Sequence, residues 1–237
     1  MIGYLELFFG KSFTGKTARM LHEIRAESRL VLVDPKCAQL VDLKGFQHVW
    51  PEYVPKTKET SAGWRGDNPA DFFRRYLGDS VSSLPSFRVV IHLRTHFKEQ
   101  LEMLCYLLRP VGHLTLAVDE LGLFIPSGSA GSLPPAITQA MISGRHEGLK
   151  FCGTAQIPSL VHFTARSNAE KIRWFRTTEF NSLQAARGYM PQSFVDSLPK
   201  LPDYVCIETS DARPPFRDES MVGKIRILGT SPKKRTD

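Results

Sequence analysis

Residues 10–17, near the N-terminus, have the types and spacing of a phosphate-binding loop. They read Gly-Lys-Ser-Phe-Thr-Gly-Lys-Thr, follow the apolar run 4–9 and precede a helical pattern. In such a setting, the backbone N–H groups of the loop and the positive end of the helix point at phosphate oxygens. We expect Lys16 to reach the β- and γ-phosphates of ATP and the Thr17 hydroxyl to bind Mg²⁺. The nucleotide-binding residues of this Walker A motif are then Gly10, Ser12, Thr14, Gly15, Lys16, Thr17 and Ala18.

A second apolar run, residues 114–118, ends in the acids Asp119 and Glu120. Such a run suits a parallel strand buried on both faces, and open α/β sheets bind ligands at the carboxyl ends of their strands. Two acids after a strand also occur in ordinary surface turns, but these lie downstream of a Walker A motif. We therefore interpret them as Walker B, in which Asp119 holds Mg²⁺ directly or through water and Glu120 polarises the water that attacks the γ-phosphate.

A polar residue, Gln156, follows a further apolar run, residues 149–155. At the carboxyl end of a strand beside Walker B, its amide can touch the γ-phosphate or the attacking water. A glutamine in a turn is otherwise usually solvated, so the sensor role depends on this expected neighbourhood.

Apolar runs alternate with helical patterns, which is typical of an α/β fold with a mostly parallel central sheet and helices on both faces. Residues 49–86 interrupt the alternation because they are rich in Pro, Gly, Lys and Ser, apart from 71–77. They are either an insertion or an exposed functional loop, and their length favours function. Strands are expected over residues 4–9, 30–34, 87–93, 114–118 and 149–155, and helices over 17–27, 97–108 and 135–143.

The composition fits a globular domain. A length of 237 residues suits one large α/β domain, and 42% hydrophobic and 23% charged residues are ordinary values. No apolar stretch approaches the ~20 residues of a membrane span, and the N-terminus lacks the layout of a signal peptide, so a cytoplasmic protein is expected. The cysteines lack metal-ligand spacing, which favours buried, reduced thiols. They are Cys37, Cys105, Cys152 and Cys206.

The chain is basic, with a net charge of +7 and a pI of about 9.3. This favours a polyanionic partner, although lysines scattered over a solvated surface give the same sum. No base-reading motif is visible, so binding to double-stranded DNA would be independent of sequence. A basic tail at 233–235 is expected to be flexible. In the first third of the chain, basic residues gather at Lys36, Lys44, Lys56, Lys58 and Arg65.

Together these motifs resemble the FtsK/HerA superfamily of DNA-pumping ATPases. The resemblance covers residues 1–208 and is carried by Walker A, by Val-Leu-Val-Asp-Pro-Lys at 31–36, by Walker B and above all by 144–159. That last segment reads Gly-Arg-His-Glu-Gly-Leu-Lys-Phe-Cys-Gly-Thr-Ala-Gln-Ile-Pro-Ser, and in the superfamily an arginine-containing turn precedes a strand ending in Thr-x-Gln-x-Pro. Residues 172–178 and 181–188 fit the strand and helix expected next. As a nearly bare motor, the chain is most similar to genome-packaging ATPases of tailless viruses with an internal membrane.

The resemblance implies a RecA-like P-loop NTPase domain over 1–208 and a C-terminal extension, 209–237, with a flexible basic tail. It also implies a homohexameric ring with ATP between subunits and double-stranded DNA in the pore, loading DNA into a preformed capsid. Lys16, Glu120 and Gln156 would be catalytic, with Thr17 and Asp119 at the metal. Capsid-vertex or viral membrane proteins are candidate partners, in the host cytoplasm or at the packaging vertex.

The resemblance further implies an arginine finger that enters the neighbouring subunit's site. Arg145 is the candidate, because it follows a helix and a Gly/Ser/Pro-rich segment that suits reaching outward. Such a finger stabilises the charge that develops on phosphoryl oxygens. A cation at this place can also stabilise the end of the preceding helix, and Arg166, Arg176 and Arg187 stay open as alternatives. The neighbouring His146 is interpreted as a structural or surface residue.

Two other hypotheses stay open. A filamentous-phage assembly ATPase of the zonula occludens toxin type has a similar Arg-His-x-Gly and Thr-x-Gln segment, but such proteins usually add a membrane span after the ATPase domain. A nucleotide-binding scaffold with little turnover is the other, and the intact Lys16, Asp119 and Glu120 argue against it. An ATP turnover assay with and without double-stranded DNA separates the three.

Overall fold

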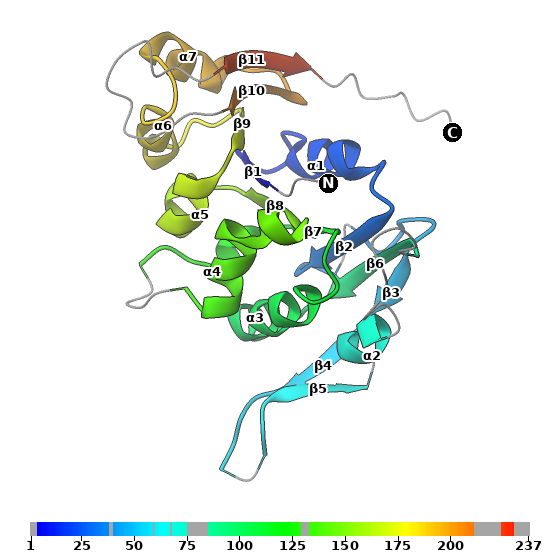
Figure 1. The fold of residues 1–237 in the computed structure, drawn as a ribbon. Coiled ribbons are helices and arrows are strands. Elements are labelled where there is room, and N and C mark those ends of the chain that lie inside the picture. Colours follow the sequence, from blue (N-terminus) through cyan, green and yellow to red (C-terminus); the bar gives the residue numbers. More distant parts are fainter. Residues whose placement is uncertain are drawn as a thin grey trace.

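A central sheet of nine strands organises the fold (Figure 1). The structure, a computed structural model, describes residues 4–37, 40–58, 60–66, 68–74, 85–128, 133–210 and 224–229. The strands of this sheet are β1 (Leu5–Phe9), β2 (Arg29–Asp34), β3 (Gln47–Val49), β6 (Phe87–His92), β7 (Thr115–Val118), β8 (Lys150–Ala155), β9 (Lys171–Phe175), β10 (Val205–Ser210) and β11 (Lys224–Gly229). Their order is β11-β10-β9-β1-β8-β7-β2-β6-β3. Neighbours from β9 to β3 run parallel, whereas β10 and β11 are antiparallel additions.

Helices cover both faces of the sheet, which confirms the predicted α/β architecture (Figure 1). Because successive side chains of a strand point to opposite faces, β1 feeds two cores. Leu7 and Phe9 join the cluster that includes the apolar side of α3, whereas Phe8 packs with Met20 and Ile24 of α1. The helices are α1 (Lys16–Ile24), α2 (Pro69–Arg74), α3 (Phe97–Leu108), α4 (Pro135–Ile142), α5 (Phe163–Asn168), α6 (Phe180–Ala186) and α7 (Gln192–Ser197). Short 3₁₀ turns are η2 (Leu121–Leu123), η3 (Gly144–Glu147), η4 (Pro158–Leu160) and η5 (Leu198–Lys200).

The parallel part of the sheet brings distant segments of the chain to one edge. Strands β1, β8, β7 and β2 lie side by side and are buried along their whole lengths. The turns after their carboxyl ends therefore meet, although they are far apart in sequence. These turns carry the Walker A loop, Lys36, the Walker B acids and Gln156. Open α/β sheets place ligand sites at this edge.

The segment 49–86 contains more regular structure than its composition predicts. Strands β4 (Pro51–Val54) and β5 (Gly63–Gly66) form an antiparallel hairpin, which projects from the body of the molecule in Figure 1, and α2 follows it. Strand β5 of the hairpin is fixed to α3, since the indole Nε1 of Trp64 donates a 2.7 Å hydrogen bond to Oε1 of Gln100. Residues 75–84, which include the end of the predicted apolar stretch 71–77, lie outside the described residues.

The C-terminal strands extend the main sheet beyond the predicted domain boundary. Residue 208 falls inside β10, and β11 pairs with β10 along its length. The predicted basic tail at 233–235 lies outside the described residues. All four cysteines are free thiols; three are buried, and Cys37 is half-buried. In the described part of the chain, no helix has the length and apolarity needed to cross a membrane.

Candidate active site

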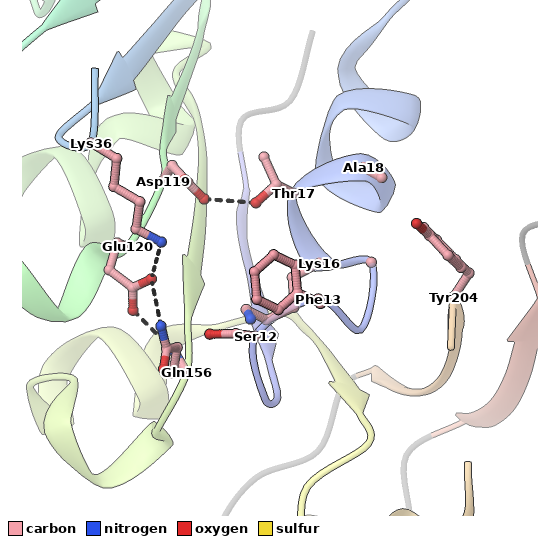
Figure 2. Close-up of a pocket in the computed structure, with 11 residues that line it drawn as sticks. Ser12, Phe13, Lys16, Thr17, Ala18, Lys36, Asp119, Glu120, Gln156 and Tyr204 are labelled. Atoms are coloured by element: carbon pink, nitrogen blue, oxygen red, sulfur yellow. Dashed lines mark hydrogen bonds and ion pairs between the residues drawn. The ribbon is translucent and has the colours of Figure 1, made fainter. Parts of the chain in front are cut away.

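A cavity of about 260 Å³ opens at the carboxyl edge of the sheet, between the Walker A loop and the turns after β2, β7 and β8 (Figure 2). It brings together most of the site residues that the sequence predicts. Gly10 and Thr14 belong to the same loop but do not line the cavity. The lining residues are Ser12, Phe13, Gly15, Lys16, Thr17, Ala18, Lys36, Asp119, Glu120, Gln156 and Tyr204.

The glycines of the Walker A loop are required by close approach and by backbone geometry. Gly10 has a φ of 150°, and a Cβ there would lie 2.6 Å from Cβ of Phe175. Gly15 has a φ of 98°, and a Cβ there would lie 2.5 Å from Cδ1 of Tyr204. Only glycine adopts these conformations without strain. Because α1 begins at Lys16, the N–H groups of Lys16, Thr17 and Ala18, which line the cavity, have no partner within the helix and are available to an anion.

Side chains of the Walker A loop hold it in shape. Nζ of Lys16 donates a 2.9 Å hydrogen bond to the carbonyl oxygen of Lys11, and the hydroxyl of Thr14 donates to the same carbonyl at 2.7 Å. Lys16 is mostly buried, and this burial lowers its pKa against the opposing attraction of Glu120 and Asp119. The ammonium group is therefore held in the cavity beside two acids, where an anionic ligand would stabilise its charged form.

Thr17 and Asp119, predicted to hold the metal, are in direct contact. The Thr17 hydroxyl donates a 2.9 Å hydrogen bond to Oδ1 of Asp119, and the hydroxyl of Thr154 donates to the same oxygen at 2.6 Å. The other carboxylate oxygen, Oδ2, is buried and has no hydrogen-bond partner among the described residues. A buried carboxylate oxygen of this kind, next to a hydroxyl, is a donor set that Mg²⁺ accepts. The residues present therefore fit the predicted ion.

Glu120 is held between two partners in the cavity. Its Oε2 accepts a 2.9 Å hydrogen bond from Nζ of Lys36 and a 3.4 Å one from Nε2 of Gln156. Its Oε1 accepts from the backbone N–H of Gln156 at 3.3 Å. The structure thus brings together the predicted base and the predicted sensor, as the dashed lines in Figure 2 show. The backbone of Glu120 is left-handed, with a φ of 53°, and its N–H donates to Thr154 Oγ1 at 3.0 Å.

The site also contains three residues that the sequence motifs did not predict there, namely Lys36, Thr154 and Tyr204. We grouped Lys36 with the basic residues of the first third of the chain, and the structure places its side chain in the cavity, where it forms an ion pair with Glu120. Burial disfavours its charge, but the hydrogen bond and charge of Glu120 outweigh burial and raise its pKa. Lys36 follows β2, the neighbour of the Walker B strand, and that position could have indicated it. No sequence pattern indicates Tyr204, because only the folding of the chain brings it next to the Walker A loop.

None of the arginine candidates is among the residues that line this cavity. Arg145 lies in η3, which precedes β8, whereas Gln156 follows β8, so the length of a six-residue strand, roughly 20 Å, separates the two edges. The side chain of Arg145 is outside the described part. Arg176 lies beside the Walker A loop, because its carbonyl oxygen accepts a 3.0 Å hydrogen bond from the N–H of Lys11, and its side chain pairs with Asp203 at 2.7 Å. Arg166 donates to the carbonyl of Val161, and Arg187 to the side chain of Gln184.

The sequence matches no protein-family model and no curated protein. Solved structures do share its fold. The packaging NTPase B204 from Sulfolobus turreted icosahedral virus 2, in complex with AMPPCP, superposes with a TM-score of 0.64 at 16% identity over 96% of this chain and 97% of that one. This chain shares the fold of that NTPase. The DNA-packaging ATPase B204 from Sulfolobus turreted icosahedral virus gives a TM-score of 0.58 at 15% identity, covering 98% of this chain and 100% of that one.

The predicted alternative also has a structural counterpart. The N-terminal domain of zonular occludens toxin from Neisseria meningitidis matches at 17% identity over 99% of this chain and 97% of that one, with a TM-score of 0.48. That likeness does not favour the phage-assembly hypothesis. The likeness to the two B204 structures establishes the fold, whereas the arrangement of the site residues indicates the chemistry.

Proposed function

We propose that this chain is an ATPase that drives sequence-independent translocation of double-stranded DNA, as part of packaging a viral genome into a preformed capsid. The observation that carries the proposal is the convergence of Lys16, Thr17, Asp119, Glu120 and Gln156 in one cavity. The fold shared with B204, whose structures are described as genome-packaging and DNA-packaging enzymes, supports the choice of cargo.

In the proposed mechanism each of these side chains has one role in hydrolysis. Lys16 would donate to the β- and γ-phosphates, and Thr17 and Asp119 would hold Mg²⁺, which would neutralise phosphate charge. As the oxygen of the attacking water bonds to the γ-phosphorus, Glu120 accepts a proton from that water. The bond between the γ-phosphorus and the oxygen that bridges it to the β-phosphate breaks, and ADP is the leaving group. Gln156 contacts Glu120 already and so orients the carboxylate and the water.

The β4–β5 hairpin is the DNA contact that we propose. Lys56 and Lys58 lie on the segment between its strands, Arg65 lies on β5, and all three are exposed. The hairpin projects from the sheet in Figure 1, so its basic tip can enter a pore in a ring of subunits. A projecting cationic tip suits phosphate contacts, which position a protein on DNA without reading its sequence.

The active unit in this proposal is a homohexameric ring, with Arg145 of one subunit at the ATP site of the next. Arg145 lies at the sheet edge opposite to the cavity of its own chain, so it can serve only a neighbour's site. Such a ring would act in the host cytoplasm, docked on a capsid vertex or on viral membrane proteins.

DNA-stimulated hydrolysis tests this function. We expect ATP turnover to rise with double-stranded DNA, equally for two unrelated duplexes of one length. The logarithm of the DNA-binding constant should fall linearly with the logarithm of salt concentration, because phosphate contacts release counterions. A Lys56→Ala/Lys58→Ala variant should lower the magnitude of this slope by about 2 for each subunit that contacts DNA, roughly 0.9 for each lost phosphate contact.

The exposed Lys200 in η5 provides the matched control, since Lys200→Ala removes a positive charge at a site remote from the hairpin. It should leave the salt slope unchanged. Turnover without any response to duplex DNA would favour a phage-assembly role over translocation. Nucleotide binding without turnover would identify a scaffold, and a strong preference for one DNA sequence would contradict the motor.

A further inference from the structure

The cavity contains a second lysine that the Walker motifs do not account for. Lys36 donates a 2.9 Å hydrogen bond to Oε2 of Glu120, with 36% of the Lys36 side chain and 15% of the Glu120 side chain exposed. The ammonium group occupies a carboxylate oxygen that would otherwise be open to the attacking water. In this arrangement both carboxylate oxygens of Glu120 accept hydrogen bonds, which fixes the side chain.

The backbone that carries Lys36 is fixed, so only its side chain has to move. Oδ1 of the buried Asp34 accepts hydrogen bonds from the backbone N–H groups of Lys36 at 3.0 Å and Cys37 at 3.1 Å. Oδ2 of Asp34 lies 3.3 Å from Nδ1 of His92, which is also buried. The turn after β2 therefore has a rigid base, from which the flexible lysine side chain extends into the cavity.

The position of Lys36 in the cavity matches the reactive end of a triphosphate. Figure 2 shows Lys36, Glu120 and Gln156 on one side of the cavity and Tyr204 on the other, with Lys16 and Thr17 between them. Because the attacking water lies between Glu120 and the γ-phosphorus, the third phosphoryl group faces Glu120. ADP held at the same loop has no third phosphoryl group, so its phosphates end before they reach Glu120. Lys36 is thus beside the atoms that distinguish ATP from ADP.

We propose that Lys36 exchanges partners on ATP binding: it pairs with Glu120 in the empty site and moves to the γ-phosphate oxygens when the triphosphate arrives. This inference rests on the proposed ATPase function. The exchange gives Lys36 two roles, to recognise ATP over ADP and to release Glu120 for proton transfer only when the substrate is present. Electrostatic attraction favours the movement of Lys36, since the terminal phosphate carries more negative charge than the carboxylate of Glu120.

Calorimetric titration with the non-hydrolysable analogue AMPPCP and with ADP, both with Mg²⁺, tests the exchange. Lys36→Met should weaken AMPPCP binding about tenfold or more, the worth of a charge-assisted hydrogen bond, and change ADP binding by less than about twofold. Lys36→Arg should keep most of the preference for the triphosphate. Lys200→Met, a remote change of the same type, should alter neither affinity.

A double-mutant cycle separates exchange from simple charge removal. Glu120→Gln should tighten AMPPCP binding, since Lys36 no longer leaves an ion pair, and most of that gain should vanish in the Lys36→Met background. Equal loss for both nucleotides, no loss, or a gain that is independent of Lys36 would overturn the exchange. If the unaltered protein neither binds nor hydrolyses ATP, it is the proposed function that fails.

Discussion

Single residues around the cavity are held in costly backbone conformations. Phe13, Glu120 and Tyr204 line it with φ angles of 63°, 53° and 64°. Each such non-glycine residue costs about 1–3 kcal/mol, and the surrounding structure must impose it. For Glu120, the hydrogen bond from its N–H to Thr154 does so. The strained backbone aims the carboxylate at the cavity, and strain of this kind collects at functional sites.

Lys16 is the residue whose loss should separate chemistry from folding. In Lys16→Ala, ATP turnover should fall by about 10² or more, because a donor aimed at developing phosphate charge is lost. The stability cost should stay near 1 kcal/mol, since one hydrogen bond to Lys11 disappears. Phosphate release and thermal unfolding measure the two effects. Near-normal turnover in this variant would mean that the Walker A assignment is wrong.

Glu120→Gln should still bind nucleotide, with AMPPCP affinity at least that of the unaltered chain, and should lower turnover by about 10² or more, because an amide keeps the shape but cannot accept the proton. Equilibrium binding of AMPPCP and steady-state hydrolysis measure the two quantities. Glu99→Gln, which changes an exposed acid on α3, is the matched control and should behave like the unaltered chain. Undiminished hydrolysis in Glu120→Gln would remove Glu120 from the mechanism.

At the scale of elements, η2 sets the position of Glu120 by packing on a glycine of β8. A Cβ on Gly153 would lie 2.6 Å from Cδ2 of Leu121, the residue after Glu120. Leu121 is fully buried, so it has little room to withdraw. The close approach of η2 to the strand therefore depends on the missing side chain at residue 153.

Gly153→Ala should disturb both stability and catalysis. Overpacking at this contact costs about 1–3 kcal/mol, and the displaced η2 should misplace Glu120 and lower kcat more than nucleotide affinity. Gly63→Ala in β5 is the control, because a Cβ there meets no atom within 4 Å. Chemical unfolding and steady-state kinetics measure the changes. A Gly153→Ala chain with unaltered stability and kcat would show that the contact does not position Glu120.

The elements with strong periodicity could be predicted from the sequence, and the irregular ones could not. The helix predicted over 97–108 has the bounds of α3, and the buried strands lie within two residues of their predicted ends. The hairpin was missed because β4 and β5 are short, contain Pro51 and Gly63, and bury neither face fully. Lys36 was assigned to a surface cluster because its contact with Glu120 spans 84 residues of sequence and depends on the neighbouring places of β2 and β7.

At the scale of the whole molecule, one buried arginine ties the antiparallel strands to the nucleotide-binding core. Arg173 on β9 lies 3.1 Å from Glu6 on β1, 2.7 Å from Glu208 on β10 and 3.5 Å from Glu23 on α1. Breaking such a buried network by removing one partner is strongly destabilising, since the others remain as uncompensated charges. The helix that begins at the Walker A loop and the C-terminal strands thus move as one unit.

The proposed ring predicts complementation between two inactive variants. Arg145→Ala should bind ATP almost normally but hydrolyse it slowly, because a finger supplied from the neighbour commonly contributes 10³ or more in rate in related phosphoryl transfer. Mixed with Lys16→Ala, it should regain part of the activity, since some interfaces then pair an intact Walker A loop with an intact Arg145. Specific activity should also rise steeply with protein concentration. Phosphate release from mixed and unmixed samples is the measurement.

Mixed rings that assemble but stay inactive would exclude Arg145 as the finger, as would dilute monomers with full turnover. In that case the same complementation with Arg166→Ala, Arg176→Ala or Arg187→Ala identifies the arginine that acts. The concentration series needs no variant and tests the shared site on its own.

Cys37, next to Lys36, is a position at which a fluorescent label can be attached to the native chain. Of the four cysteines, Cys105, Cys152 and Cys206 are buried, whereas Cys37 is half-buried at the turn after β2. Burial raises the pKa of its thiol, so alkylation should be slow at neutral pH and faster in alkaline buffer. A fluorophore attached there would sit beside the lysine that we propose to move. Nucleotide arrival could then be followed optically, in real time, without engineering a new cysteine.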